Sequence, residues 1–329
     1  MTQPVLDIQQ LHLSFPGFNG DVHALNNVSL QINRGEIVGL VGESGSGKSV
    51  TAMLIMRLLP TGSYCVHRGQ ISLLGEDVLN AREKQLRQWR SARVAMIFQE
   101  PLTSLNPLLT VGSQIYEQVK IHTPGISRTD CKAVCIEMLK KTGIPDPEGV
   151  YKNYPAFLSG GMRQRVMIAI AMVCNPALLI ADEPTTALDV TIQAQILSLM
   201  KGLQKEYETA IMFITHDLGV IAETADRVMV MYAGQVVEEA DVRSIFHNPV
   251  HPYTRGLLNS TVRVHEIADR LETIDGVVPT LSKMPKGCRF APRCPYACDT
   301  CRATIPQLRS VGDCPGHYAR CIRAGGEQA

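Results

Sequence analysis

The chain carries a glycine-rich loop whose residue types and spacing suit phosphate binding. Residues 42–49 read Gly-Glu-Ser-Gly-Ser-Gly-Lys-Ser, which fits the pattern G-x-x-x-x-G-K-[ST]. Glycines let successive backbone N–H groups converge on phosphate oxygens, and a following helix N-terminus adds positive dipole. Lys48 would reach the β- and γ-phosphates, and the Ser49 hydroxyl would bind Mg²⁺. A Gly/Ser-rich surface loop is the alternative, and the strand and helix expected on either side of the loop disfavour it.

Two adjacent carboxylates follow another apolar stretch. Residues 178–183 read Leu-Leu-Ile-Ala-Asp-Glu, a buried-strand pattern that ends in Asp182 and Glu183. The first carboxylate can hold Mg²⁺ through water, and the second can orient or deprotonate an attacking water. Two solvated acids at a strand end are common in isolation. A phosphate loop in the same chain favours the metal and water roles instead.

The elements that must position these residues alternate between strands and helices. The runs with the pattern of buried strands are 37–41, 93–98, 177–181 and 211–215. Helical spacing is found at 50–59, 111–121, 130–142, 165–173 and 190–203. Period-two patterns predict strands at 5–15 and 24–32 and a hairpin at 228–238. This alternation indicates an α/β fold with a mostly parallel sheet covered on both faces.

A further motif, Leu-Ser-Gly-Gly-Met-Arg-Gln at 158–164, precedes the helix at 165–173. By itself it could be a Ser-Gly helix cap. Together the three motifs resemble an ATP-binding-cassette (ABC) ATPase, the nucleotide-hydrolysing subunit of a transporter, over about residues 4–240. The resemblance implies a P-loop NTPase (RecA-like) cassette with an antiparallel N-terminal β-subdomain and a helical subdomain at about 101–160. In that family the signature loop completes the ATP site of the opposite subunit, which implies binding in trans by Ser159, Gly160, Gly161 and Gln164.

The resemblance also assigns residues around ATP and magnesium. Glu183 and His216 are the expected catalytic residues, and His216 would contact the γ-phosphate. Mg²⁺ is expected at Ser49, Gln99 and Asp182, where Gln99 matches the glutamine that senses the metal. The expected ATP-binding residues are Phe15, Gly42, Glu43, Ser44, Gly45, Ser46, Gly47, Lys48, Ser49, Val50, Gln99 and Asp182.

Less specific assignments follow from the same resemblance. Phe15 is the candidate for stacking on adenine, with a place in the core as the alternative. Residues 187–189 match the loop that crosses the dimer interface. Residues 101–109, just after Gln99, are expected to dock the coupling helix of a permease, because a switch must touch what it moves.

Length and charge exclude other classes. The 329 residues favour a main domain with an appendage. A net charge of +1 lacks the basic excess typical of nucleic-acid binding, so a DNA-repair or translation cassette ATPase is the weaker alternative. The N-terminus has no secretory-signal pattern, and the apolar run 166–181 is broken by Asn175 and Pro176. We therefore expect a cytosolic chain that reaches a membrane through partners.

Residues 241–329 predict a C-terminal extension with a metal centre. The segments His-Pro-Tyr-Thr-Arg-Gly-Leu-Leu at 251–258 and Gly-Cys-Arg-Phe-Ala-Pro-Arg-Cys at 287–294 resemble those that follow the cassette in dipeptide, oligopeptide and nickel importer subunits. In some of these subunits a [4Fe–4S] cluster is bound at a spacing matched by Cys288, Cys294, Cys301 and Cys314. Spacing does not separate this cluster from a zinc site, and free thiols remain a third alternative. Further thiols at Cys298 and Cys321 leave the ligand set open.

The whole chain is thus predicted to be an ABC ATPase domain at 1–240 with an extension at 241–329, powering import of di- or oligopeptides with ATP and Mg²⁺. The resemblance implies two transmembrane permease subunits and a second, non-identical ATP-binding subunit. It also implies an extracytoplasmic substrate-binding protein acting indirectly, a place on the cytoplasmic face of the inner membrane, and no nucleic acid. Nickel or a metal chelate is the alternative cargo, because such a subunit does not touch what is transported.

Overall fold

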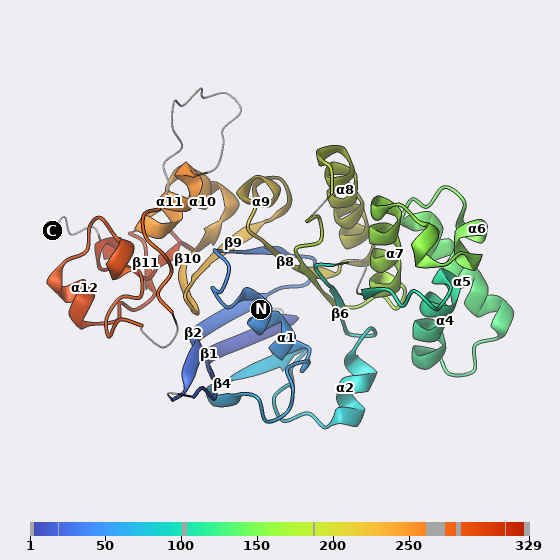
Figure 1. The fold of residues 1–329 in the computed structure, drawn as a ribbon, viewed down its shortest axis with the longest axis horizontal. Helices are drawn as coiled ribbons and strands as arrows, with labels where there is room; N and C mark the ends of the chain where they lie inside the picture. The colour runs from blue at the N-terminus through green and yellow to red at the C-terminus, as the bar shows by residue number, and fades with distance from the viewer. Residues whose placement is uncertain are drawn as a thin grey trace. The chain divides into compact units, whose positions relative to one another are not determined.

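The structure is a computed structural model that describes residues 3–18, 20–100, 104–186, 188–260, 274–280, 284–312 and 314–325 (Figure 1). The chain folds into two compact units. Unit 1 comprises residues 1–5, 32–36 and 80–212, and unit 2 comprises 6–31, 37–79 and 213–329. The predicted boundary at 240/241 falls within strand β10 (Gln235–Asp241) of unit 2, and the division into residues 1–240 and 241–329 stays a prediction.

Unit 1 combines parallel strands with a helical region. Strand β6 (Val94–Ile97) pairs in parallel with β7 (Leu178–Asp182). All five residues of β7 are buried, as expected of a strand covered on both faces. The described helices of this unit are α2 (Glu83–Trp89), α4 (Val111–His122), α5 (Arg128–Lys141), α6 (Pro147–Lys152), the 3₁₀ turn η1 (Pro155–Phe157), α7 (Gly160–Met172) and α8 (Val190–Tyr207).

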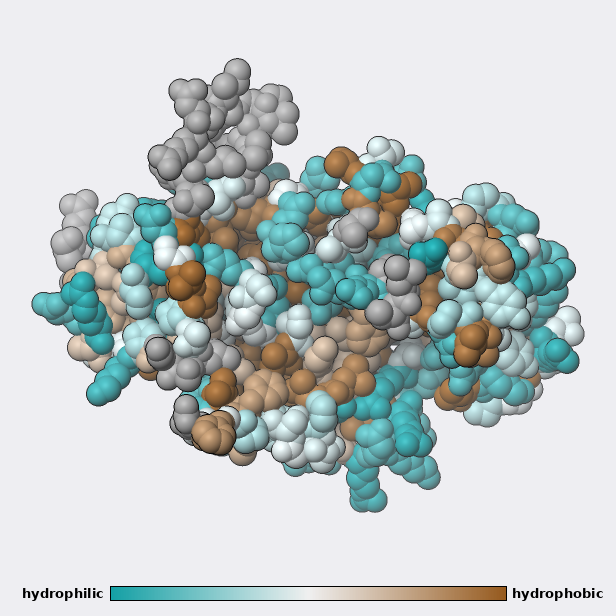
Figure 2. All heavy atoms as spheres, in the orientation of Figure 1, coloured by the Kyte–Doolittle hydropathy of each residue, from teal (hydrophilic) through white to brown (hydrophobic). Residues whose placement is uncertain are grey.

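Polar residues set where the helices of unit 1 begin. The side chains that accept a backbone N–H from the first turn belong to Thr110, Ser127, Asp146, Ser159 and Asp189. Each such cap contributes about 1 kcal/mol to the stability of its helix. Helix α2 lies at the surface, where Figure 2 shows hydrophilic side chains over it, and within this fully described helix Leu86 and Trp89 are buried.

Unit 2 contains two sheets. The first has the order β2-β1-β4-β5, formed by β1 (Leu6–Phe15), β2 (Val22–Ile32), β4 (Cys65–Leu73) and β5 (Glu76–Asp77). In the second, β3 (Ile37–Val41) pairs in parallel with β9 (Arg227–Tyr232), and β9 pairs antiparallel with β10. The short strands β12 (Tyr318–Ala319) and β11 (Arg309–Ser310) extend this sheet beyond β10. The C-terminal extension therefore joins the sheet through β12.

The helices of unit 2 pack close to these strands. They are α1 (Lys48–Ile55), α9 (Leu218–Thr224), α10 (Val242–His247), α11 (Pro252–Asn259), α12 (Asp299–Ala303) and the 3₁₀ turns η3 (Ala291–Arg293) and η4 (Ile322–Gly325). A Cβ at Gly39 of β3 would lie 2.8 Å from Cδ1 of Ile221 in α9, so the glycine permits this close packing. Strand β8 (Ala210–Thr215) begins in unit 1 and ends in unit 2, and its six residues are all buried.

Helix α1 and strand β4 are two of the elements at which the structure differs from the sequence prediction. The helix predicted at 50–59 ends at Ile55, because Arg57 takes a left-handed φ of 51° and its guanidinium donates to the carbonyl of Val78. Strand β4, which the sequence analysis did not predict, has mostly exposed or half-exposed residues over its first six positions. No helix in the described ranges is both long and apolar enough to span a membrane.

Candidate functional site

The phosphate loop of unit 2 folds tightly between β3 and α1. Gly42 has φ 153°, and a Cβ there would lie 2.1 Å from the carbonyl oxygen of Met231, so no other residue fits without moving the backbone. The ammonium of Lys48 donates to the carbonyls of Gly42 at 2.7 Å and Glu43 at 3.0 Å. The Lys48 side chain is thereby held inside the phosphate loop, and the residue is 7% exposed.

The same loop leaves the start of α1 ready for an anion. Gly47, with φ 104°, precedes the first turn Lys-Ser-Val-Thr, which holds no acidic residue. Backbone N–H groups and the helix dipole at such a terminus favour a phosphate. Ser44, Gly45 and Ser49 are exposed, whereas Ser46 is buried. The loop thus offers both a lysine and a positive helix end, which fits the phosphates of a nucleotide.

Two further predicted residues lie in unit 2. Phe15 ends β1 and is half-buried. His216 directly follows β8 and is exposed. Its neighbour Asp217 caps α9 by accepting from the N–H groups of Gly219 and Val220, which fixes the backbone beside the histidine.

Unit 1 brings Gln99 and Glu183 together. Gln99 Nε2 donates to Glu183 Oε2 at 3.0 Å, and Thr186 Oγ1 donates to the same oxygen at 2.9 Å. Glu183 has a left-handed φ of 49°, a conformation that costs energy in a non-glycine residue and is common at functional sites. Asp182 ends β7 and is buried. The carboxylate and amide oxygens gathered here are ligands that Mg²⁺ accepts.

The signature loop caps α7, and its residues differ in exposure. The Ser159 hydroxyl accepts the N–H of Met162 at 3.3 Å, and Ser159 and Gly160 are exposed. A Cβ on Gly161 would lie 2.9 Å from Cγ2 of Ile192 in α8, so this glycine lets two helices approach. Gln164 of α7 is 2% exposed, and its predicted binding of ATP in trans stays a prediction. Its Nε2 finds no partner among the described residues.

The predicted cysteine ligands are only partly gathered. Cys288, Cys294, Cys301 and Cys321 line one small cavity of about 20 Å³ in unit 2. Cys314 is exposed and does not line that cavity. The reason is β12, which pairs with β10 after Cys314 and returns the chain so that Cys321, not Cys314, comes beside the others. In the described part of the chain no group of three or more His, Cys, Asp or Glu side chains is arranged to hold a metal ion as it stands.

Two family models match separate parts of the chain, one in the cassette and one that reaches into the C-terminal extension. The family model described as "ABC transporter" matches residues 25–186, and the model "Oligopeptide/dipeptide transporter, C-terminal region" matches 237–301. A probable D,D-dipeptide transport ATP-binding protein, DdpD of Escherichia coli K12, is 63% identical over 313 residues, which are 95% of each chain. This chain belongs to the ATP-binding subunits of dipeptide and oligopeptide import ABC transporters.

Other relatives agree with this family. The oligopeptide transport ATP-binding protein AppD of Bacillus subtilis is 48% identical and is matched over 99% of each chain. Among solved structures, the dimeric ABC cassette MJ0796 bound to ADP and Pi is 28% identical with a TM-score of 0.65, covering 72% of this chain and 99% of that one. The fold is the ABC ATPase cassette. The subunit is an ATPase that uses ATP and Mg²⁺ and is coupled to peptide import.

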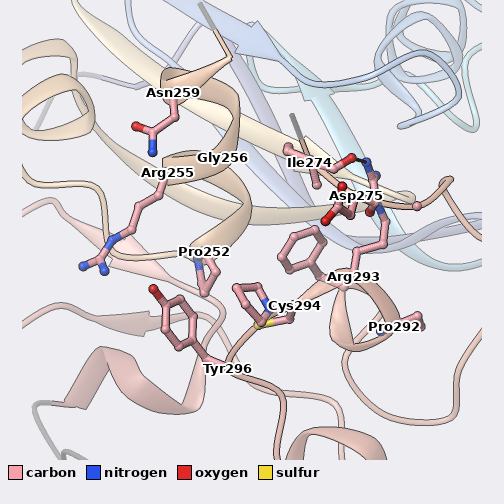
Figure 3. A pocket seen from close by; sticks show the side chains of 13 residues that line it. Pro252, Arg255, Gly256, Asn259, Ile274, Asp275, Pro292, Arg293, Cys294 and Tyr296 are labelled. Carbon is pink, nitrogen blue, oxygen red and sulfur yellow. Dashed lines mark hydrogen bonds between the residues drawn. The ribbon is translucent and has the colours of Figure 1, made fainter. Parts of the chain in front are cut away.

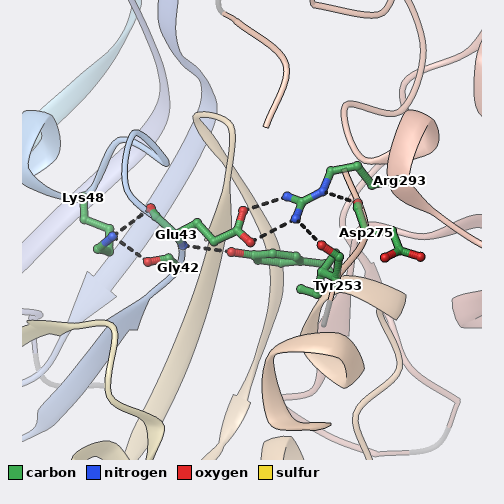
Figure 4. A network of polar contacts seen from close by, with 7 residues as sticks. Gly42, Glu43, Lys48, Tyr253, Asp275 and Arg293 are labelled. Atoms are coloured by element: carbon green, nitrogen blue, oxygen red, sulfur yellow. Dashed lines mark hydrogen bonds and ion pairs between the residues drawn. The ribbon is translucent and has the colours of Figure 1, made fainter. Parts of the chain in front are cut away.

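The extension of this ATP-binding subunit contacts its own phosphate loop, which the sequence analysis did not predict. Arg293 forms two hydrogen bonds with the carboxylate of Glu43, and the hydroxyl of Tyr253 accepts the N–H of Glu43 at 2.8 Å (Figure 4). Burial opposes the charge of Arg293, yet the hydrogen bonds to Glu43 raise its pKa above the usual value. Burial also raises the pKa of Tyr253. Both residues lie within the importer-type segments quoted above, which was the available signal.

The helix that carries Tyr253 is fixed by a buried acid. Glu238 of β10, which is 0% exposed, accepts the N–H groups of Val250 at 2.7 Å and His251 at 3.0 Å. His317 Nε2 lies 2.8 Å from the same carboxylate, and because a carboxylate only accepts, this nitrogen carries the proton. His251 Nδ1 in turn accepts the N–H of Tyr253, and burial lowers the pKa of His251 to about 3. His251 is therefore a neutral helix cap.

A groove of about 500 Å³ lies beside this region (Figure 3). Arg255 and Asn259 of α11 line one side, and Arg293, Cys294 and Tyr296 line the other. Arg293 thus forms part of the wall of the groove while its guanidinium is engaged with Glu43.

Proposed function

We propose that this subunit works on the cytoplasmic face of the inner membrane with two permease subunits, a second ATP-binding subunit and an external substrate-binding protein, and that its cargo is a dipeptide. The likeness to DdpD, named as a D,D-dipeptide transport protein, supports the cargo. The match of residues 237–301 to the peptide-transporter C-terminal region is the observation that carries the proposal. The dimeric form of the cassette MJ0796, bound to ADP and Pi, supports a pair of ATP-binding subunits.

In unit 2, we propose that residues 42–50 bind the phosphates of ATP. Lys48, already inside the loop, supplies a positive charge, and the Ser49 hydroxyl is a magnesium ligand. The half-buried Phe15 stacks on adenine, and the exposed His216 contacts the γ-phosphate. Ser49 and His216 are exposed, Phe15 is half-buried, and Lys48 is held inside the loop, so the described fold is compatible with these roles.

In unit 1, we propose that Asp182 and Gln99 hold magnesium and that Glu183 is the general base for the attacking water. The hydrogen bond from Gln99 to Glu183 supports a link between the two roles. Ser159, Gly160 and Gly161 bind the ATP of the partner subunit, since the helix start that they form is exposed except for the half-buried Gly161. We exclude the buried Gln164 from this group.

The docking surface for a permease is proposed at 101–109. Residues 101–103 lie outside the described residues, as does Ala187 of the predicted interface loop at 187–189. Within the described part of the segment, Leu108 is 83% exposed, and an exposed leucine suits contact with a partner helix.

We further propose a soft-metal centre at Cys288, Cys294, Cys301 and Cys321. Four thiols on one largely apolar cavity are the donor set that iron–sulfur clusters and zinc select. In the described structure these thiols are not arranged to hold a metal ion, and their cavity has a volume of about 20 Å³. Either a zinc ion or the [4Fe–4S] cluster that the family resemblance implied would therefore require the loops that carry the thiols to move. Iron, zinc and labile sulfide analysis of anaerobically purified protein distinguishes the two. Absence of both metals, with all four thiols reactive, would contradict the centre.

The cargo is tested by uptake in a strain lacking this subunit. We expect loss of labelled D-Ala-D-Ala uptake and recovery with the wild-type gene, while nickel uptake stays unchanged. The matched control is the Lys48→Ala variant, which should be expressed but should not restore uptake. Unchanged dipeptide uptake in the deletion strain, or loss of nickel uptake alone, would contradict the proposal.

A further inference from the structure

Glu43, the second residue of the phosphate loop, is bound on three sides by different partners (Figure 4). Its carboxylate accepts Arg293 Nη1 at 2.7 Å and Nη2 at 3.1 Å, a two-point contact. Its backbone N–H donates to the Tyr253 hydroxyl at 2.8 Å, and its carbonyl accepts Lys48 Nζ at 3.0 Å. One residue of the loop therefore links the extension to the lysine proposed to contact phosphate.

Arg293 is itself fixed on the side away from the loop. Its Nε donates to the carbonyl of Asp275 at 3.0 Å, and its Nη2 donates to the carbonyl of Ile274 at 3.1 Å. The Arg293 side chain is 5% exposed and that of Glu43 is 29% exposed. A planar guanidinium with this many partners holds its direction, whereas a lysine would offer only a point charge.

Tyr253 is equally well anchored. It is fully buried, and its ring packs against those of Tyr232 and Phe290 with centroids 4.7 Å and 5.5 Å away. The N-terminus of its helix is tied to β10 through Glu238. The hydroxyl that meets the Glu43 N–H therefore has a defined position.

A separate contact leads from the extension to the other half of the loop. The guanidinium of Arg289 donates to the carbonyl of Ala233, and the next residue, Gly234, donates its N–H to the carbonyl of Ser46 at 2.8 Å. Arg289 and Arg293 each neighbour a cysteine of the small cavity, Cys288 and Cys294.

From these contacts we infer that Arg293 and Tyr253 are positioning residues for ATP binding: they set the conformation of the phosphate loop through Glu43. This inference rests on the proposed assignment of residues 42–50 as the phosphate site. The C-terminal extension would thereby influence ATP binding through the phosphate loop. Without the two contacts Glu43 is released, and the carbonyl that helps hold Lys48 loses its fixed place.

The test measures the Kd of MgATP for the full-length subunit and the KM and kcat for ATP in the assembled transporter. Arg293→Gln removes the two-point contact, and Tyr253→Phe removes one oxygen while keeping the packed ring. We expect the Kd and KM to rise about tenfold in the first variant and about threefold in the second, with kcat changed less than KM. The control is Arg302→Gln, because Arg302 is exposed and pairs with Asp299 within its own helix.

A double variant separates positioning from a general loss of structure. If Arg293 acts through Glu43, Glu43→Gln combined with Arg293→Gln should bind MgATP no more weakly than the weaker single variant. Effects that multiply, or a Kd within twofold of wild type in both single variants, would overturn the inference. Lys48→Ala tests the assignment of the phosphate site: if this variant binds MgATP with wild-type affinity, the assignment is wrong. If Lys48→Ala loses MgATP binding while Arg293→Gln binds with wild-type affinity, only the inference about Arg293 is refuted.

Discussion

Replacement of Glu238 by alanine should detach the start of α11 from β10. The wild-type carboxylate is fully buried and accepts three hydrogen bonds, from the N–H groups of Val250 and His251 and from His317. A hydrogen bond to a charged group contributes about 1.5 to 3 kcal/mol to stability, so three together give about 4.5 to 9 kcal/mol. Water entering the space left by the side chain offsets part of this loss. We therefore expect Glu238→Ala to reduce the stability of this region by about 4 kcal/mol.

Hydrogen–deuterium exchange measures the loss of local stability at the start of α11. A loss of about 4 kcal/mol corresponds to about 10³-fold faster exchange of the amides of residues 250–258, provided that global unfolding is rarer still. Glu238→Gln keeps one acceptor oxygen and should show a smaller effect. The control is Glu137→Ala, whose exposed carboxylate pairs with Lys140 one turn away and should change stability by less than about 0.5 kcal/mol. If Glu238→Ala accelerates exchange less than about fivefold, the carboxylate does not anchor this helix.

Two other outcomes follow from buried groups. Because the folded-state pKa of His251 is lowered to about 3 from 6.5, the unfolded chain takes up a proton that the folded chain refuses, so stability falls as the pH drops below about 6.5, by up to about 1.4 kcal/mol per pH unit. His251→Asn keeps a capping side chain and should flatten the pH dependence of urea unfolding between pH 6.5 and 4; an unchanged slope would refute this. Gln164→Met replaces a buried amide whose Nε2 is unpaired in the described structure, so stability should stay equal or rise by about 1 kcal/mol with ATPase activity within twofold of wild type. A tenfold fall in turnover without loss of stability would instead restore the trans-binding role.

The elements that sequence predicts well are those with a strong local signal. Strand β3 has the predicted bounds, because a turn precedes its buried run and the glycine-rich loop follows it, which marks both ends of the strand. Helix α4 was predicted within one residue, since Thr110 provides a cap at its start. Helix α1 ended early for a reason absent from its own residues, the hydrogen bond from Arg57 to Val78. Local pattern does not contain such a contact.

The site shows the same contrast. The residues of the phosphate loop form a contiguous motif at 42–49, so the sequence alone identifies them. The contact between Glu43 and Arg293 joins residues 250 positions apart, and only the fold brings them together. The cysteines illustrate the limit of spacing: Cys314 and Cys321 both followed the first three at plausible distances, and the pairing of β12 with β10 decides which one returns to the cavity.

ATP turnover by the assembled transporter carrying Glu183→Gln tests most directly whether Glu183 is the general base of this ATPase. If Glu183 is the base of an ATPase that drives import, MgATP should bind with a Kd within about threefold of wild type, while hydrolysis falls by at least about 10²-fold and peptide uptake stops. The amide still accepts the hydrogen bond from Thr186, so the loop should keep its conformation. Hydrolysis and uptake at the wild-type rate would show that Glu183 is not the general base.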